Sequence, residues 1–284
     1  MAGFKNIREY AEALQQGRTH VGHCRKVPSQ ASTAGWWVDL SMAAGNPLAN
    51  YYASEPLVAA TLLAKRGIWH GDDKSPSTKH LTEISLCTPT AGLVGVYRLL
   101  DYLVYYPFID GDSTDTQAMD NTVTLPRYTT GEGVYAMMVA TAPTAAAGTF
   151  TYNYVDSDNN SKTSATITTA TAFANISSIM TSEQGTGAIG SPFLRMASGS
   201  RGIKQITDIT YSVAPSGNCA IVLVKPIAHH TILEINTPHE IPFVSNKPGA
   251  PRVYDGAYLG LIMNCAATVA AGILVGRFNF AWSV

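Results

Sequence analysis

The chain has 284 residues, enough to bury a full hydrophobic core in one large domain or in two of ordinary size. Only 14% of the residues are charged, the formal net charge is −1 and no run of Lys or Arg exceeds two, so the positive patch expected of a nucleic-acid-binding protein is missing. A surface so poor in charge is either coated with Ser and Thr or covered by other subunits, and we favour subunit contacts.

A short helix is predicted at the start of the chain. Apolar residues recur at helical spacing within residues 4–16, and Gly17 follows where a helix commonly ends. The apolar positions of this pattern are Phe4, Ile7, Ala11 and Leu14. The same stretch lacks the apolar core of a secretory signal, so we expect synthesis in a cytoplasm.

Residues 54–67 are a second candidate helix, with Ser54 as N-cap and Gly67 as the stop.

Nearly all of the remaining sequence is typical of β-strands. Short runs rich in Val, Ile, Thr, Tyr and Phe are separated by Gly, Pro, Asn and Asp. In residues 149–155 every second side chain is aromatic, and the Asp- and Asn-rich residues 156–160 favour a hairpin turn, so residues 161–169 are expected to pair back. In chain order, the predicted strands comprise residues 35–40, 93–106, 134–142, 149–155, 162–169, 208–213, 219–228 and 230–235.

The apolar stretch of residues 257–278 is nearly long enough to cross a bilayer. It is interrupted by Asn264 and three glycines, however, and residues 276–284 alternate between apolar and polar side chains, which is the period of a half-buried strand. We therefore expect two strands joined near residues 266–271, and no membrane segment.

Together these patterns predict a mainly β protein, with a main domain of β-sandwich or jelly-roll type and a short N-terminal helix. Residues 143–215 are richer in Thr, Ser, Ala and Gly than their flanks, which indicates an inserted or second β subdomain. The main domain then comprises residues 1–142 together with residues 216–284. No repeat of fixed period is present, which argues against a solenoid or a propeller.

Four aspartates crowd the loop between two apolar runs. They are Asp110, Asp112, Asp115 and Asp120. A calcium loop of the EF-hand kind needs Gly at its sixth position and Glu at its twelfth, which counted from Asp110 are Asp115 and Asn121. The string DSDNNS, which starts at Asp156, fails the same test. Asp and Ser side chains fold back onto their own backbone in turns, so we interpret both stretches as turns, with a cation site as the alternative.

Two further motifs also have structural explanations. The string GTGAIG, residues 185–190, matches the dinucleotide-binding fingerprint, but Ser191 and then a proline follow where the helix would have to begin. Two pairs of histidines are close in sequence, but on a strand the members of each pair face opposite sides, so a shared metal ion requires a bulge or a partner strand. These pairs are His20 with His23 and His229 with His230.

No catalytic, cofactor-binding or metal-binding residue is assigned, and we expect neither an enzyme nor a cofactor. The sequence contains no nucleophile elbow, zinc-protease motif or P-loop, although a catalytic pair of carboxylates assembled in space stays open. The candidate carboxylates are Asp39, Glu83, Asp101 and Glu132. The four cysteines form no closely spaced pair, which favours buried free thiols over a zinc site or disulfides. They are Cys24, Cys87, Cys219 and Cys265.

Aromatic residues gather in the first half of the chain beside Pro and Asn. Such clusters usually form the core corners of a β-sandwich, and a sugar-binding or protein-binding surface is the alternative. The residues are Trp36, Trp37, Tyr51, Tyr52, Trp69, Tyr105 and Tyr106.

Six strings carry a resemblance to a known group of proteins. They are QGRTH, RKVPSQ, GWWVDLSMAAGNPLANYY, GIWHG, DYLVYYPFID and DNTVTLPRY. They resemble segments of uncharacterised virion structural proteins of tailed bacteriophages, best from Met1 to about Ala142 and less so in the Thr- and Ser-rich middle. None of the strings is an active-site motif, so the resemblance implies a component of the virus particle and carries over no functional residue.

The resemblance and the low charge lead us to expect a virion structural protein that assembles in the cytoplasm of a bacterial host. We expect a capsid decoration, or cement, protein that stabilises the head through contacts with copies of itself, for example in a trimer, and with the major capsid protein. Nucleic acid and membrane are not expected partners. A tail protein of tube, nozzle or fibre type that recognises a host glycan is the alternative, and a glycan-degrading virion enzyme is a third possibility. The major capsid protein itself is disfavoured because no helical window is long enough for its spine helix.

Overall fold

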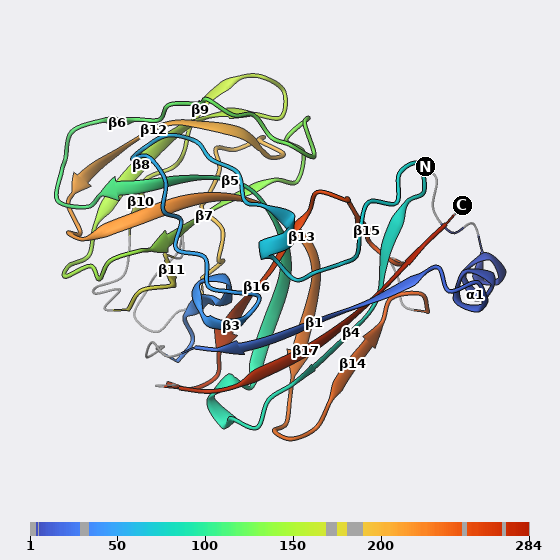
Figure 1. Ribbon diagram of the computed structural model, residues 1–284. Helices are drawn as coiled ribbons and strands as arrows, with labels where there is room; N and C mark the ends of the chain where they lie inside the picture. The colour runs from blue at the N-terminus through green and yellow to red at the C-terminus, as the bar shows by residue number, and fades with distance from the viewer. Residues whose placement is uncertain are drawn as a thin grey trace.

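The computed structural model describes residues 4, 6–28, 34–168, 175–180, 190–245, 249–268 and 271–283. In this part of the chain a closed β-barrel lies between two antiparallel sheets, and the short helix α1 (Ile7–Gln15) lies at the outer side of one of them (Figure 1). The fold is therefore mainly β with a short N-terminal helix, as the sequence predicts.

The barrel has the strand order β11-β2-β16-β5-β13-β7. Its strands are β2 (Trp37–Asp39), β5 (Gly95–Asp110), β7 (Tyr135–Ala140), β11 (Ser178–Met180), β13 (Asn218–Ile232) and β16 (Tyr258–Cys265). The sequence of β5 is almost continuously apolar because both faces of the strand are covered. Leu100 lies in the barrel interior, whereas Leu99 packs toward one covering sheet and Leu103 toward the other. This strand thus connects three hydrophobic clusters.

The first covering sheet, here called the β8 sheet, has the order β10-β8-β12-β6, with β9 paired to β8. Its strands are β6 (Gln117–Ala118), β8 (Thr149–Asp156), β9 (Ser161–Thr163), β10 (Ile167–Thr168) and β12 (Ile203–Val213). Phe150, Tyr152 and Tyr154 of β8 are buried on one face against the barrel, and Asn159 in the following turn has a left-handed backbone (φ 65°). The predicted hairpin is confirmed.

The second covering sheet, the β4 sheet, has the order β14-β4-β17-β1-β3, with β15 paired to β4. Its strands are β1 (Thr19–Val27), β3 (Ala44–Asn46), β4 (Lys79–Cys87), β14 (His239–Pro242), β15 (Arg252–Val253) and β17 (Leu274–Trp282). Phe278 and Phe280 of β17 are buried against Leu259 and other barrel residues. Strands β16 and β17 are the two strands predicted from the C-terminal apolar stretch. Within the described residues, no helix has the length and hydropathy needed to cross a membrane.

The second predicted helix is wrong. Residues 54–67 contain only the single 3₁₀ turn η2 (Ala64–Arg66). The segment runs extended beside other strands, where the N–H of Ala59 donates to the carbonyl of Asp120 at 2.8 Å and Ala60 exchanges two hydrogen bonds with Tyr105. Since these partners satisfy the backbone, the local helical pattern is overridden. The other 3₁₀ turns are η1 (Leu40–Met42) and η3 (Ala91–Leu93).

Several strand boundaries differ from the prediction. The two strands expected at residues 219–228 and 230–235 are the single long strand β13, and the strand expected at residues 162–169 is divided into β9 and β10. Residues 143–215 contribute most of the β8 sheet, yet β11 from this segment joins the barrel and β6 from outside it joins the β8 sheet. The separate subdomain stays a prediction.

Candidate functional site

Helix α1 leaves its apolar stripe exposed. The helix begins after Asn6, whose side chain accepts a hydrogen bond from the N–H of Glu9 at 3.0 Å, and Gly17 follows it with a left-handed backbone (φ 67°). Only Ala13 of the helix is buried. The α1 stripe consists of Ile7, Ala11 and Leu14, of which Ile7 is 67% and Leu14 is 48% exposed. At spacings of four and three residues these side chains lie on one helix face, and leaving them in water is unfavourable unless a partner covers them.

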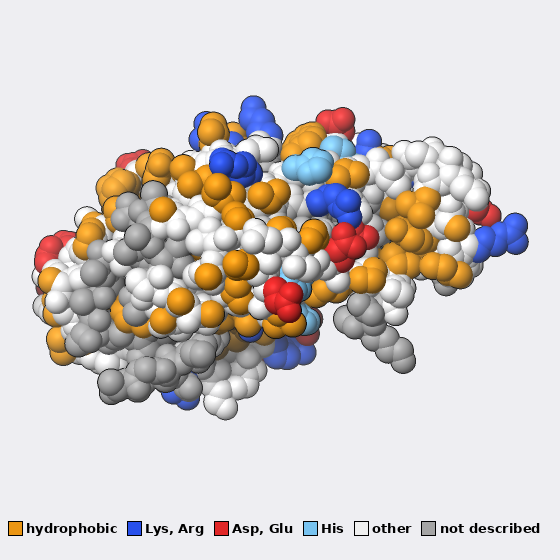
Figure 2. All heavy atoms as spheres, turned by 90° about the horizontal axis from the view of Figure 1, so that it is seen from below, with side chains coloured by type: hydrophobic (Ala, Val, Ile, Leu, Met, Phe, Trp, Pro, Cys, Tyr) orange, Lys and Arg blue, Asp and Glu red, His pale blue; other side chains and the backbone are white. Residues whose placement is uncertain are grey.

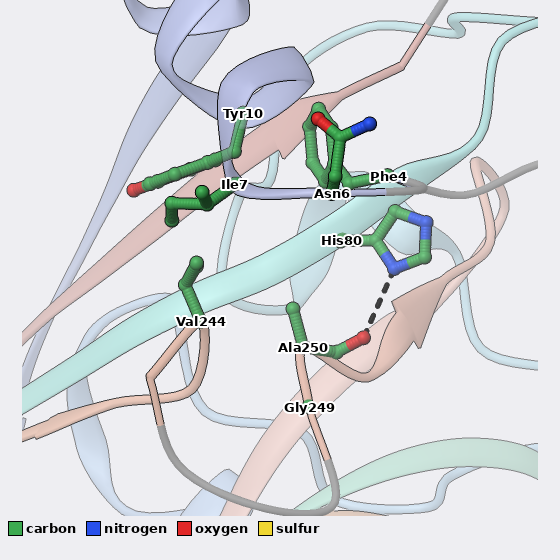
Figure 3. Close-up of a pocket in the computed structure, with 8 residues that line it drawn as sticks. All are labelled: Phe4, Asn6, Ile7, Tyr10, His80, Val244, Gly249 and Ala250. Atoms are coloured by element: carbon green, nitrogen blue, oxygen red, sulfur yellow. Dashed lines mark hydrogen bonds between the residues drawn. The ribbon is translucent and has the colours of Figure 1, made fainter.

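An apolar groove adjoins the α1 stripe (Figure 3). It encloses about 270 Å³, and its described lining residues are Phe4, Asn6, Ile7, Tyr10, His80, Val244, Gly249 and Ala250. The ring centroid of Phe4 lies 5.5 Å from that of Tyr10 and 5.6 Å from that of His80. The Nδ1–H of His80 donates to the carbonyl of Ala250 at 3.0 Å, and burial lowers the pKa of the imidazole. The described lining residues of the groove are therefore uncharged at neutral pH.

Asp39, one of the four candidate carboxylates, lies in the barrel interior and is fully buried. Its Oδ1 accepts hydrogen bonds from the N–H of Ser41 at 2.8 Å and the hydroxyl of Tyr102 at 2.7 Å, and its Oδ2 accepts from the hydroxyls of Ser41 and Tyr52. Gly260 makes room for the Tyr102 ring, because a Cβ there would stand 2.6 Å from it. Burial raises the pKa of Asp39, and the four donors act in the opposite direction. The cluster holds β2, η1 and β5 together.

Asp101, the second candidate, forms a buried ion pair with Arg127. The Nε and Nη2 atoms of Arg127 lie 2.8 and 2.6 Å from the two carboxylate oxygens, and Nη2 also donates to the carbonyl of Tyr102. The N–H of Tyr258 completes the set at 3.1 Å. Burial raises the pKa of Asp101 to about 6, while Arg127 opposes this shift. The pair fastens the 126–132 loop to the barrel wall.

The remaining two candidate carboxylates lie at the surface. Glu83 is 2.9 Å from Nη2 of Arg277 in the β4 sheet, and Glu132 is 3.9 Å from Nη1 of Arg201. Each of the four carboxylates thus has its own partners, and their hydrogen bonds and ion pairs do not join one of them to another.

The histidine pairs and the aspartate loops are placed as their sequence interpretation predicts. His20 is half-buried and His23 exposed, as expected of opposite strand faces, and the same alternation separates exposed His229 from buried His230. Asp110 Oδ1 accepts a hydrogen bond from the N–H two residues later at 2.9 Å, which is turn chemistry. The part of the chain that the structure describes contains no group of three or more His, Cys, Asp or Glu side chains placed to hold a metal ion. Residues 185–189 of the GTGAIG string lie outside the described residues.

The aromatic cluster is divided between core and surface. Trp37, Tyr52, Tyr105 and Tyr106 are buried, and Trp36 is packed partly buried against the core. Tyr51 is 64% and Trp69 is 41% exposed.

Among the cysteines, Cys24 and Cys219 are buried free thiols and Cys87 is half-buried, whereas the side chain of Cys265 lies outside the described residues.

Sequence reasoning missed a buried cluster around Lys79. The Nζ of Lys79 donates to Nδ1 of His70 at 3.1 Å and lies 3.1 Å from the carboxylate of Asp255. The Nε2–H of His70 donates to the carbonyl of Ala257 at 2.9 Å, which fixes the neutral tautomer. Burial, assisted by the charge of Lys79, lowers the pKa of His70 to about 4. The cluster combines three separate segments, so no local pattern could have revealed it.

This cluster predicts a dependence of stability on pH. The unfolded chain protonates His70 near pH 6.5, whereas the folded protein does so only near pH 4. The unfolded state therefore binds more protons in this window, and the free energy of unfolding falls as the pH falls through it. Between pH 6.5 and about pH 5, His70 should contribute a loss of about 2 kcal/mol. Urea unfolding of the natural protein and of His70→Gln across this range measures the contribution of His70. The other histidines titrate in both proteins, so their contribution cancels. Parallel pH profiles would contradict the prediction.

Comparisons with known proteins identify no relative. No family model matches the chain, and no curated protein matches it. Among solved structures, the chain is weakly similar to a structure of the Gt strain of infectious bursal disease virus, with a TM-score of 0.13, 14% identity, and coverage of 93% of this chain and 65% of that one. A mutant VP2 protein of the same virus gives a TM-score of 0.12 at 9% identity, covering 93% of this chain and 77% of that one. The chain spans just under two thirds of the first structure, and at such TM-scores the likeness carries no argument about fold or function.

Proposed function

We propose that this chain is a structural protein of a tailed-phage virion, and specifically a capsid decoration protein. In this role it covers joints between subunits of the head and adds buried contact area there, in an oligomer of its own copies. The exposed α1 stripe is the observation that carries the proposal, because an apolar helix face next to an apolar groove is suited to helix-mediated docking.

The rest of the surface supports the same role. Figure 2 shows hydrophobic side chains spread over this face of the molecule, with one contiguous group toward the end at which α1 lies. Only 14% of the residues are charged, and this suits interfaces between subunits, whose centres are depleted in charge. The layered β-fold also provides a rigid body, as a part that clamps neighbouring subunits needs.

The α1 stripe can be tested directly. Purified protein should cosediment with heads of the phage that carries its gene, and the double variant Ile7→Ser with Leu14→Ser should bind at least about tenfold more weakly, because two apolar side chains no longer become buried. Its free energy of unfolding should change by only about 0.5 kcal/mol, since both side chains are exposed in the free protein.

A matched control replaces two exposed apolar residues elsewhere. Leu48→Ser with Val213→Ser removes side chains that are 79% and 53% exposed, and it should leave cosedimentation unchanged. Equal binding of the α1 variant and the natural protein would contradict docking through α1. Electron microscopy of intact particles that places the chain only in the tail would contradict the decoration role itself.

A further inference from the structure

We propose that a second groove, on the side of the barrel at the 126–132 loop, binds an acidic saccharide of the uronic-acid class. The Lys225 groove, as we call it, is lined by Arg127, Tyr128, Thr129, Glu132, Lys225 and Tyr254, and it encloses about 540 Å³. This volume lies in the range typical of small-molecule sites. The proposal goes beyond the virion role and does not rest on it.

Two cations stand on the groove wall. Arg127 is held in place by the buried carboxylate of Asp101 through two hydrogen bonds, at 2.8 and 2.6 Å, so its guanidinium is positioned before any ligand arrives. The Nζ of Lys225 donates to the carbonyl of Glu132 at 2.8 Å and lies 5.3 Å from the centroid of the Tyr128 ring. An ammonium group has three donor hydrogens, so Lys225 keeps donors for a ligand.

The aromatic wall of the groove is also fixed in advance. Tyr128 has a left-handed backbone (φ 52°), which is uncommon for a residue with a side chain and concentrates at functional sites. Its ring meets that of Tyr254 edge to face, with centroids 5.0 Å apart, and the guanidinium of Arg252 lies 4.1 Å from the Tyr254 ring. A wall held from several sides loses little conformational freedom when a ligand binds.

The lining chemistry selects the ligand class. The ammonium of Lys225 keeps free donors, and the guanidinium of Arg127 lines the same groove, so a ligand carboxylate would gain charge-assisted hydrogen bonds there. The exposed carboxylate of Glu132 and the hydroxyl of Thr129 fit the hydroxyl groups of a sugar, because one accepts hydrogen bonds and the other both accepts and donates. Glu132 would repel a multiply charged phosphate, and a neutral sugar would lack the charge-assisted hydrogen bonds that a carboxylate makes with Lys225. A sugar acid satisfies both sides of the groove.

Titration calorimetry with digalacturonic acid tests the proposal. The natural protein should bind it with a dissociation constant of about 1 mM or lower, and should bind neutral maltose at least about tenfold more weakly. Lys225→Gln should weaken the binding of digalacturonic acid at least about tenfold, whereas Lys225→Arg, which keeps the charge, should retain most of it. Lys65→Gln removes an exposed lysine outside the groove and should change nothing.

Thermal unfolding shows whether each variant is folded, and Tyr254→Phe, which removes one hydroxyl from a lining residue of the groove, supplies an independent variant that should also bind more weakly. Absence of binding to the natural protein would overturn the proposal, and so would equal affinity for maltose. Displacement of the ligand by equimolar sulfate would show a site for anions in general and would overturn the saccharide assignment.

Discussion

Replacing Arg127 by Met should lower the free energy of unfolding by about 3–5 kcal/mol at neutral pH. The substitution leaves the carboxylate of Asp101, whose side chain is fully buried, without its cation, and leaves the carbonyl of Tyr102 without the Nη2 donor. An uncompensated charge in the interior is far more costly than a lost contact at the surface, because water cannot replace the partner. Urea unfolding at neutral pH, monitored by tryptophan fluorescence, measures the loss.

The chain provides a matched control for this variant. Arg201 lies 2.6 Å from Asp158, the same distance that separates Arg127 from Asp101, but both members of the Arg201 pair are largely exposed. Arg201→Met should therefore leave the free energy of unfolding almost unchanged. Adding Asp101→Asn to Arg127→Met should recover much of the lost stability, since no charge is left unpaired. Similar losses for the two single arginine variants would show that burial does not govern the strength of the pair.

The parts of the fold that were predictable are those specified by local alternation. The aromatic face of residues 149–155 and the alternation of residues 276–284 identify strands because a strand with one covered face repeats every two residues. Both patterns are complete within a short window. Residues 54–67 also present a complete local pattern, that of a helix, yet their backbone partners, Asp120 and Tyr105, lie far away in sequence. The conformation of this segment is determined by hydrogen bonds to residues distant in sequence, and a single sequence does not show such bonds.

The candidate functional residues show the same contrast between features that a short stretch of sequence specifies and features that depend on distant partners. Asp39 and Asp101 are candidate carboxylates in the sequence, and both are buried, but partners such as Tyr102 and Arg127 lie in other segments and only the folded chain shows them. The sequence predicts the apolar positions of α1, whereas the direction in which they point depends on Ala13 packing inward. The Lys225 groove combines the 126–132 loop, β13 and the residue after β15, so only the folded chain reveals it.

Replacing Asp39 by Ala should lower the free energy of unfolding by about 3–5 kcal/mol. The carboxylate accepts four hydrogen bonds from Ser41, Tyr52 and Tyr102 inside the barrel, and its removal leaves buried donors unpaired and opens a cavity between them. Some of the loss is recovered locally, since the hydroxyls of Ser41 and Tyr52 already lie 3.1 Å apart and can pair with each other.

Two further variants test whether the loss of stability in Asp39→Ala is specific to this buried carboxylate or follows from removing any aspartate. Tyr102→Phe removes one of the four donors while the carboxylate keeps three, so it should cost about 1–2 kcal/mol. Asp115→Ala removes an exposed turn carboxylate and should change the free energy of unfolding by about 0.5 kcal/mol or less. Urea unfolding should therefore show the largest loss of stability for Asp39→Ala, a smaller loss for Tyr102→Phe and the smallest for Asp115→Ala. An Asp39→Ala variant no less stable than Tyr102→Phe would mean that the barrel is held by its apolar packing, and that the polar cluster contributes specificity of arrangement rather than stability.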